Sequence, residues 1–233
     1  MTPGNLPFRL IFPGRIYFCP QDGLFLKKVC KLKIIALTGG VGCGKTTAST
    51  LIRNHGIPCI DADRLCHELY AQPDSPLLRK MRGRWGDRIF HADGTVNRNV
   101  LGGIVFRDDA EREALNGLFR PAADAELERR IAEYRAQDTP LLLLDVPLLF
   151  ESGWDRYADV TIAVWAPRAL QLERVMKNRG WSEDELDRRR AAQMDETEKL
   201  ERADCGIINS GGELFLARQC GRILDEIQQT LLS

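Results

Sequence analysis

The sequence has 233 residues, with 33 Lys and Arg residues against 33 Asp and Glu residues, so its formal net charge is zero. Its 44% hydrophobic and 28% charged residues are typical of a globular protein, and its length fits one large domain or a core with an insertion. Balanced charge argues against a protein that coats nucleic acid or an anionic membrane, because such proteins are usually basic overall.

The N-terminal segment differs from the rest of the chain in charge. Residues 1–33 carry six basic side chains against one acidic side chain, so the remainder is net acidic. We therefore expect residues 1–32 to be an N-terminal extension, followed by a domain over residues 33–233. The most apolar run, residues 141–150, contains Asp145 and Pro147 and is too short to span a bilayer.

Seven cysteines without a C-x-x-C pair are typical of a reduced compartment. We therefore predict a cytoplasmic protein without a membrane or nucleic-acid partner. Nothing in the sequence defines the oligomeric state, and a monomer is the default expectation.

Five short apolar runs predict strands that alternate with helices. The first, residues 33–38, is stopped by Gly39 and Gly40, and a helix is expected over residues 46–54. Alternating strands and helices predict an α/β fold with a parallel sheet. The remaining strands are expected at residues 57–61, 141–144, 159–164 and 205–208.

About 80 residues separate the second and third predicted strands, which is more than a simple crossover needs. Their pattern is helical, so we expect a helical insertion over about residues 66–140. Pro121 interrupts its longest helix, predicting two helices or one kinked helix over residues 109–134. After the fourth strand, residues 168–177 predict a helix. Ser182 and Glu185 predict a capping box that opens another, to about residue 194.

Residues 39–46 read Gly-Gly-Val-Gly-Cys-Gly-Lys-Thr and match the phosphate-binding pattern G-x-x-x-x-G-K-[ST] between a strand and a helix. Glycines let backbone N–H groups converge on phosphate oxygens, and the following helix directs its positive end at the same anion. Lys45 is predicted to contact phosphates and Thr46 to bind Mg²⁺. The predicted nucleotide-binding residues here are Gly40, Val41, Gly42, Cys43, Gly44, Lys45, Thr46 and Thr47.

Two further groups of carboxylates follow predicted strands. Asp145 ends the third strand, where it could hold Mg²⁺ or cap a helix. Asp61 and Asp63 follow the second strand and emerge at the same sheet edge as the glycine-rich loop. A carboxylate there could accept a proton from an attacking hydroxyl, although an ordinary helix cap at Asp63 is equally compatible with the sequence.

Basic residues cluster after the fourth strand. Such a run usually forms a solvated helix face, but here it lies where small P-loop kinases carry a mobile lid, expected over about residues 168–200. A cation that closes on a transferring phosphoryl group accelerates such reactions. Arg174 and Arg179 are the candidates for nucleotide contact, without a decision between them.

Several segments together resemble the dephospho-coenzyme A kinase family over residues 33 to about 225. The resemblance implies a P-loop core formed by residues 33–65, 141–165 and 203–233, with a coenzyme A-binding insertion and a lid. The segments that carry it are residues 36–46, 60–63, 145–151, 171–174, 192–193, 203–204 and 209–211.

The resemblance implies transfer of the γ-phosphoryl group of ATP, with Mg²⁺, to the ribose 3′-hydroxyl of dephospho-CoA, which is the last step of coenzyme A synthesis. By similarity, Asp63 is the catalytic base and Lys45 stabilises the phosphates. Substrate-binding positions implied in the same way are Asp61, Asp63, Arg98 and Leu148. Alternatives are another P-loop small-molecule kinase, such as a nucleoside monophosphate kinase, or a nucleotide-binding module without turnover.

The sequence departs from the family pattern in two places, and Cys43 adds a separate prediction. Arg120 stands where the family usually has His before Pro121, and residues 177–179 replace a variable basic stretch. Cys43 lies inside the glycine-rich loop, so we expect a bulky thiol adduct to block nucleotide binding and ATP to protect the thiol.

Overall fold

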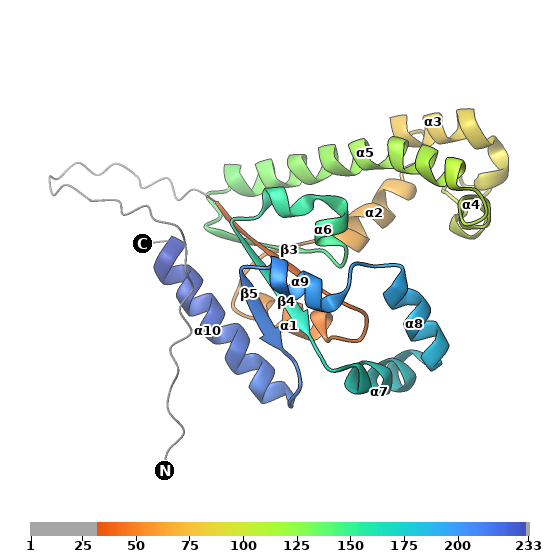
Figure 1. The fold of residues 1–233 in the computed structure, drawn as a ribbon. Coiled ribbons are helices and arrows are strands. Elements are labelled where there is room, and N and C mark those ends of the chain that lie inside the picture. Colours follow the sequence, from red (N-terminus) through yellow and green to blue (C-terminus); the bar gives the residue numbers. More distant parts are fainter. Residues whose placement is uncertain (1–31, 232–233) are drawn as a thin grey trace, which may run out of the picture.

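The computed structural model describes residues 32–231, and the segment 1–31 of the predicted extension lies outside them. Leu32, the last residue of the predicted extension, is buried in the core. The described strands form one parallel sheet in the order β2-β3-β1-β4-β5 (Figure 1). They are β1 (Lys33–Gly39), β2 (Cys59–Asp61), β3 (Leu141–Asp145), β4 (Val160–Trp165) and β5 (Cys205–Ile208).

The sheet divides the core into two apolar clusters, one on each face. Ile35 and Leu37 of β1 face the cluster that contains α1 (Lys45–Arg53) and α10 (Glu213–Leu231). Ile34 and Ala36 face the cluster formed with the insertion. Because neighbouring residues of a strand point to opposite faces, a parallel strand covered on both sides is apolar throughout, as the predicted strands are.

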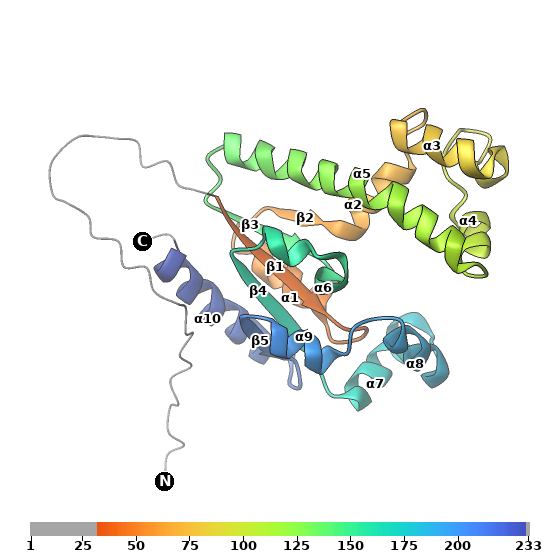
Figure 2. The same ribbon diagram turned by 45° about the horizontal axis from the view of Figure 1, so that its top comes forward.

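The insertion between β2 and β3 forms a helical unit beside the sheet, at the top right of Figure 1 and more clearly separated in Figure 2. Its longest helix, α5, is continuous through Pro121, and it packs on α2, α3 and α4. Of the predicted alternatives, two separate helices are therefore wrong. The unit comprises α2 (Ala62–Tyr70), α3 (Pro76–Trp85), η1 (Asp87–Ile89), α4 (Arg98–Val105) and α5 (Asp109–Ala136).

Five short helical segments lie between β3 and β5 in the chain. The capping-box helix ends at residue 191, earlier than predicted, and only half of the box forms: the Ser182 side chain accepts from the Glu185 N–H, whereas the Glu185 carboxylate binds arginines. The helix α9 was not predicted and packs on β1 and β4. These segments are α6 (Leu149–Ser152), η2 (Trp154–Tyr157), α7 (Arg168–Arg179), α8 (Glu183–Ala191) and α9 (Glu196–Arg202). Across residues 32–231, every helix is too short or too polar to cross a membrane.

Candidate active site

The glycine-rich loop is held by side chains that arrive from distant parts of the chain. Gly44 has φ 89° at the start of α1, and a Cβ there would overlap the Nδ2 of Asn209, which donates to the Cys43 carbonyl at 2.8 Å. A Cβ on Gly40 would overlap the buried Glu196 side chain. Glycine is thus required both by backbone conformation and by close packing of α9 and the β5–α10 connection on the loop.

Arg174 binds both the loop and Asn209. Its guanidinium donates to the carbonyls of Gly42 and Cys43 at 3.4 and 3.5 Å, and to the backbone and side-chain oxygens of Asn209 at 3.1 and 3.3 Å. Arg174 also lines the cavity above the loop. It therefore fixes the loop geometry and places a positive charge beside the cavity.

The Cys43 thiol faces the core, not the cavity. The residue has no exposed surface, and burial raises the pKa of the thiol to about 11. Thiolate reactivity needs exposure and a low pKa, so this position argues against ready modification of Cys43, and the expected block by a thiol adduct stays a prediction. The sequence placed Cys43 correctly in the loop but could not show which way its side chain points.

Register brings two carboxylates, Asp61 and Asp145, to one edge of the sheet. Asp145 pairs with Leu37 of β1 and with Asp61 of β2, so the ends of these strands are level. The buried Asp145 carboxylate forms an ion pair with the Lys45 ammonium of the loop, and it caps no helix. The predicted metal ligand therefore lies directly beside the phosphate-binding loop.

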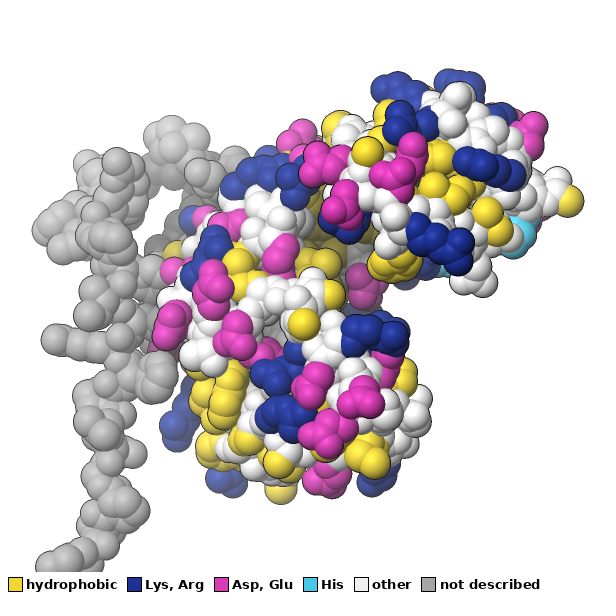
Figure 3. Space-filling view, turned by 45° about the vertical axis from the view of Figure 1, so that its right-hand side comes forward, with side chains coloured by type: hydrophobic (Ala, Val, Ile, Leu, Met, Phe, Trp, Pro, Cys, Tyr) yellow, Lys and Arg dark blue, Asp and Glu magenta, His cyan; other side chains and the backbone are white. Residues whose placement is uncertain are grey.

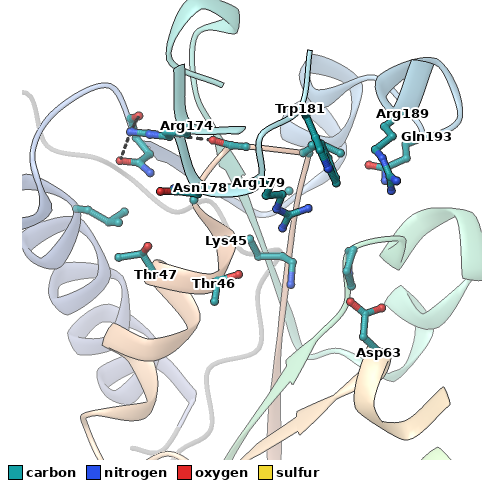
Figure 4. A pocket seen from close by; sticks show the side chains of 18 of the residues that line it. Lys45, Thr46, Thr47, Asp63, Arg174, Asn178, Arg179, Trp181, Arg189 and Gln193 are labelled. Atoms are coloured by element: carbon teal, nitrogen blue, oxygen red, sulfur yellow. Dashed lines mark hydrogen bonds between the residues drawn. The ribbon is translucent and has the colours of Figure 1, made fainter. Parts of the chain in front are cut away.

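Asp61 and Asp63 have different roles. The Asp61 side chain caps α2 by accepting from the Arg64 N–H at 3.0 Å, so the helix cap considered for Asp63 is formed by its neighbour. Asp63 points into the cavity across from Lys45 (Figure 4). Desolvation raises the pKa of Asp63, helped by the charges of Asp61 and Asp145, while Lys45 and Arg98 oppose the shift.

Two cavities meet at Asp63. One, of about 630 Å³, lies over the glycine-rich loop and is lined by Lys45, Thr46 and Thr47. The other, of about 690 Å³, lies between α5 and the β3–α6 connection. Both open into the recess between the insertion and the core in the space-filling view (Figure 3). The residues that line both are Asp63, Pro147 and Leu148.

The helices α7 and α8 cover the first cavity with cationic and aromatic side chains. Arg179 and Arg189 lie over the Trp181 ring, at 4.7 and 4.1 Å from its centroid, and all three line the cavity (Figure 4). Arg190 of α8 binds both carboxylate oxygens of the buried Glu196, at 2.8 and 2.9 Å. This bidentate pair ties α8 to the α9 residue that packs on Gly40.

Comparisons with known proteins identify the family of the chain. The profile of the dephospho-CoA kinase family matches residues 33–214. A dephospho-CoA kinase of Symbiobacterium thermophilum is 41% identical over 180 residues, covering 77% of this chain and 75% of the relative. One from Arabidopsis thaliana is 34% identical and covers 86% of each chain. The chain belongs to the dephospho-CoA kinase family.

Solved structures support the same fold. The crystal structure of TT1252 from Thermus thermophilus has a TM-score of 0.67 and 32% identity, and covers 84% of this chain and 97% of its own. A dephospho-CoA kinase from Campylobacter jejuni has a TM-score of 0.66 at 24% identity, covering 85% and 98%. At that identity the likeness shows the fold alone, which is the P-loop kinase α/β fold predicted from the sequence.

The structure brings most of the predicted site residues of this kinase together, with three exceptions, and Cys43, whose side chain is buried in the core, is the first. Arg98 lies at the start of α4, 5.9 Å from the Tyr70 ring centroid, and lines neither cavity. Asp61 is occupied in capping α2. Several other lining residues had no site role assigned from the sequence, because only the fold brings them over the loop: Asn178, Trp181, Arg189, Gln193 and Asn209.

Proposed function

We propose that this protein transfers the γ-phosphoryl group of ATP to the ribose 3′-hydroxyl of dephospho-CoA, with Asp63 as the base. The observation that carries the proposal is the position of Asp63 where two cavities meet, with the phosphate-binding loop on one side only. ATP would occupy the cavity over the loop and the acceptor the cavity against α5. The acceptor hydroxyl would then lie beside Asp63 and face the γ-phosphoryl group.

Asp63 is suited to accept the hydroxyl proton. Its side chain is exposed to the cavity, and its raised pKa makes it a stronger base than an ordinary aspartate while Lys45 keeps the anion stable. Phosphoryl transfer has a loose transition state, so the larger contribution of Asp63 would be to orient the hydroxyl. The cap formed by Asp61 fixes the first turn of α2 and hence the position of Asp63.

Charge on the phosphates would be neutralised by the loop, Lys45 and the helices above it. Lys45 pairs with Asp145 in this structure, and this ion pair keeps the Lys45 ammonium at the N-terminus of α1, where phosphates would bind. Arg174 is engaged with loop carbonyls, so Arg179 and Arg189 are the arginines that can approach the transferring group. We therefore assign the lid to α7 and α8, and α9 to the core.

The donor set fits Mg²⁺ held jointly with a nucleotide. Thr46 presents an exposed hydroxyl and Asp145 a carboxylate, both beside Lys45. Within residues 32–231 no cluster of three or more His, Cys, Asp or Glu side chains could bind a metal alone. Mg²⁺ commonly uses one or two protein ligands and completes its shell with phosphates and water. Bound by Thr46 and Asp145, it would neutralise phosphate charge.

An acceptor panel tests the proposal. The purified chain is mixed with ATP, Mg²⁺ and, in separate reactions, dephospho-CoA, a nucleoside monophosphate or shikimate, and ADP formation is followed. We expect turnover with dephospho-CoA and a product that carries phosphate on the ribose 3′-oxygen. Turnover with another acceptor but not with dephospho-CoA would contradict the proposed substrate, and ATP binding without any turnover would indicate a nucleotide-binding module.

We also propose that the enzyme acts in the cytoplasm. Its substrates are those of central metabolism, and the described cysteines, Cys43, Cys59, Cys66, Cys205 and Cys220, are all free thiols.

A further inference from the structure

The cavity against α5 has an unusual balance of charge for a site that would take an anionic acceptor. Among its lining residues, three carry carboxylates, Asp63, Glu113 and Glu151, and Arg120 is the one cation. Dephospho-CoA bears a diphosphate on the 5′ carbon of the ribose whose 3′-hydroxyl would be phosphorylated. Its anionic group must therefore enter the same cavity as Asp63.

The carboxylates leave one favourable place for that diphosphate. Glu151 is already neutralised, because its Oε1 lies 2.9 Å from the ammonium of the buried Lys199. Glu113 precedes Arg120 by seven residues on α5, which places it about 10 Å away along the helix axis. Asp63 faces the reacting hydroxyl. Lys45 and Arg98 act on this cavity through their charges from outside its lining, and Arg120 is the one cation in its wall.

Arg120 is held in position but is not saturated. One of its terminal nitrogens donates to the Glu151 backbone carbonyl at 3.1 Å, which attaches the side chain to α6 across the cavity. Within residues 32–231 the guanidinium makes no other hydrogen bond or ion pair. A guanidinium has five N–H donors in a planar fork that matches phosphate oxygens, so four donors remain for a ligand.

We infer that Arg120 binds the diphosphate of the acceptor and thereby selects a nucleotide acceptor that carries a 5′-diphosphate. The inference rests on the proposed function and adds to it the residue that recognises the acceptor. Arg98, the candidate from the sequence, lies 5.9 Å from the Tyr70 ring centroid and lines neither cavity. Arg98 affects the cavity through its charge, and Arg120 contacts the ligand.

The first test compares Arg120→Ala with the wild type. Losing charged hydrogen bonds should raise the KM for dephospho-CoA about 10–100-fold and leave the KM for ATP unchanged. Arg135→Ala is the matched control, since Arg135 is exposed on the same helix and lines neither cavity. Thermal unfolding checks that both variants fold. A KM for dephospho-CoA within twofold of wild type, or an equal rise in the control, would overturn the inference.

The second test makes the cation titratable. In Arg120→His, the imidazole should be charged at pH 6 and neutral at pH 8, so the KM for dephospho-CoA should rise between these values relative to the wild type. A purely structural role of Arg120 would give the variant and the wild type parallel pH profiles, which would overturn the inference. Absence of turnover with dephospho-CoA in the wild type would instead overturn the proposed function, and this inference with it.

Discussion

The two cavities share Asp63, Pro147 and Leu148 but are built in different ways. The nucleotide cavity is formed by backbone of the contiguous glycine-rich loop, the start of α1 and several cations, including Lys45 and Arg174. The cavity against α5, where we propose that the acceptor binds (the acceptor cavity), is formed by side chains scattered from residue 62 to residue 154, with one cation. The main-chain N–H groups of the first cavity suit phosphate whatever the side chains are. The second cavity depends on a few side chains, so single substitutions there can change its specificity.

The largest expected effect is in the lid over the nucleotide cavity. Replacing both Arg179 and Arg189 by Ala should lower kcat by about 10³-fold or more, because arginines that neutralise the transferring group contribute 10³–10⁵ in related reactions. The KM for dephospho-CoA should stay unchanged, since neither arginine lines the acceptor cavity. Steady-state kinetics with each substrate varied in turn measures both values.

Arg188→Ala is the matched control for the lid. Arg188 lies on α8 beside Arg189 and pairs with Glu185, and it does not line the nucleotide cavity. We expect near-wild-type kinetics. If the double variant of Arg179 and Arg189 keeps kcat within tenfold of wild type, the loop and Lys45 suffice to neutralise the transferring phosphoryl group. The lid arginines would then not be part of the difference between the two cavities.

Asp63 tests the point where the cavities meet. Asp63→Asn removes the proton acceptor but keeps the shape of the side chain, so kcat should fall about 10²–10⁴-fold. The Kd for ATP, measured by calorimetry, should remain within about twofold. Asp61→Asn is the control, since Asn caps a helix as well as Asp does, and we expect little change. A raised KM for dephospho-CoA in the Asp61→Asn control would support Asp61 as a substrate contact. An Asp63→Asn enzyme with wild-type activity would contradict the assignment of Asp63 as the base.

Lys199 supports the wall common to both cavities. The Lys199 ammonium pairs with Glu151 at 2.9 Å and donates to the Pro147 carbonyl at 2.8 Å, with 1% of its side chain exposed. Lys199→Met leaves a partly buried carboxylate without its cation, so the free energy of unfolding should fall by about 3–5 kcal/mol, measured in urea. The exposed Arg129 pairs with Glu133, and Arg129→Ala should cost less than about 1 kcal/mol. Equal losses would contradict the supporting role of Lys199.

The smallest expected effect is a shift in pH dependence. Asp63 must be ionised to accept a proton, so kcat/KM should fall as the pH drops through its pKa, which lies above that of an ordinary aspartate. Arg98 lowers this pKa, so Arg98→Gln should move the acidic limb of the profile to higher pH. A limb that stays in place or moves to lower pH would show that Arg98 does not act on Asp63.

The sequence by itself determined the family, the parallel sheet and the phosphate-binding loop. The loop could be identified because its chemistry is carried by eight consecutive residues, 39–46, so no long-range contact is needed to assemble it. The predicted dephospho-CoA kinase family and P-loop fold are confirmed by the comparisons. The roles of individual site residues remain predictions for the experiments above.

Tertiary structure alone decided which side chains face the cavities. Asp61 and Asp63 are two residues apart and chemically identical, and only the start of α2 makes one a cap and the other a cavity residue. Arg120 of α5 donates to the Glu151 carbonyl of α6, although the two residues lie some 30 positions apart in the chain. Such contacts depend on how helices pack over long sequence separations, and local sequence pattern carries no record of that packing.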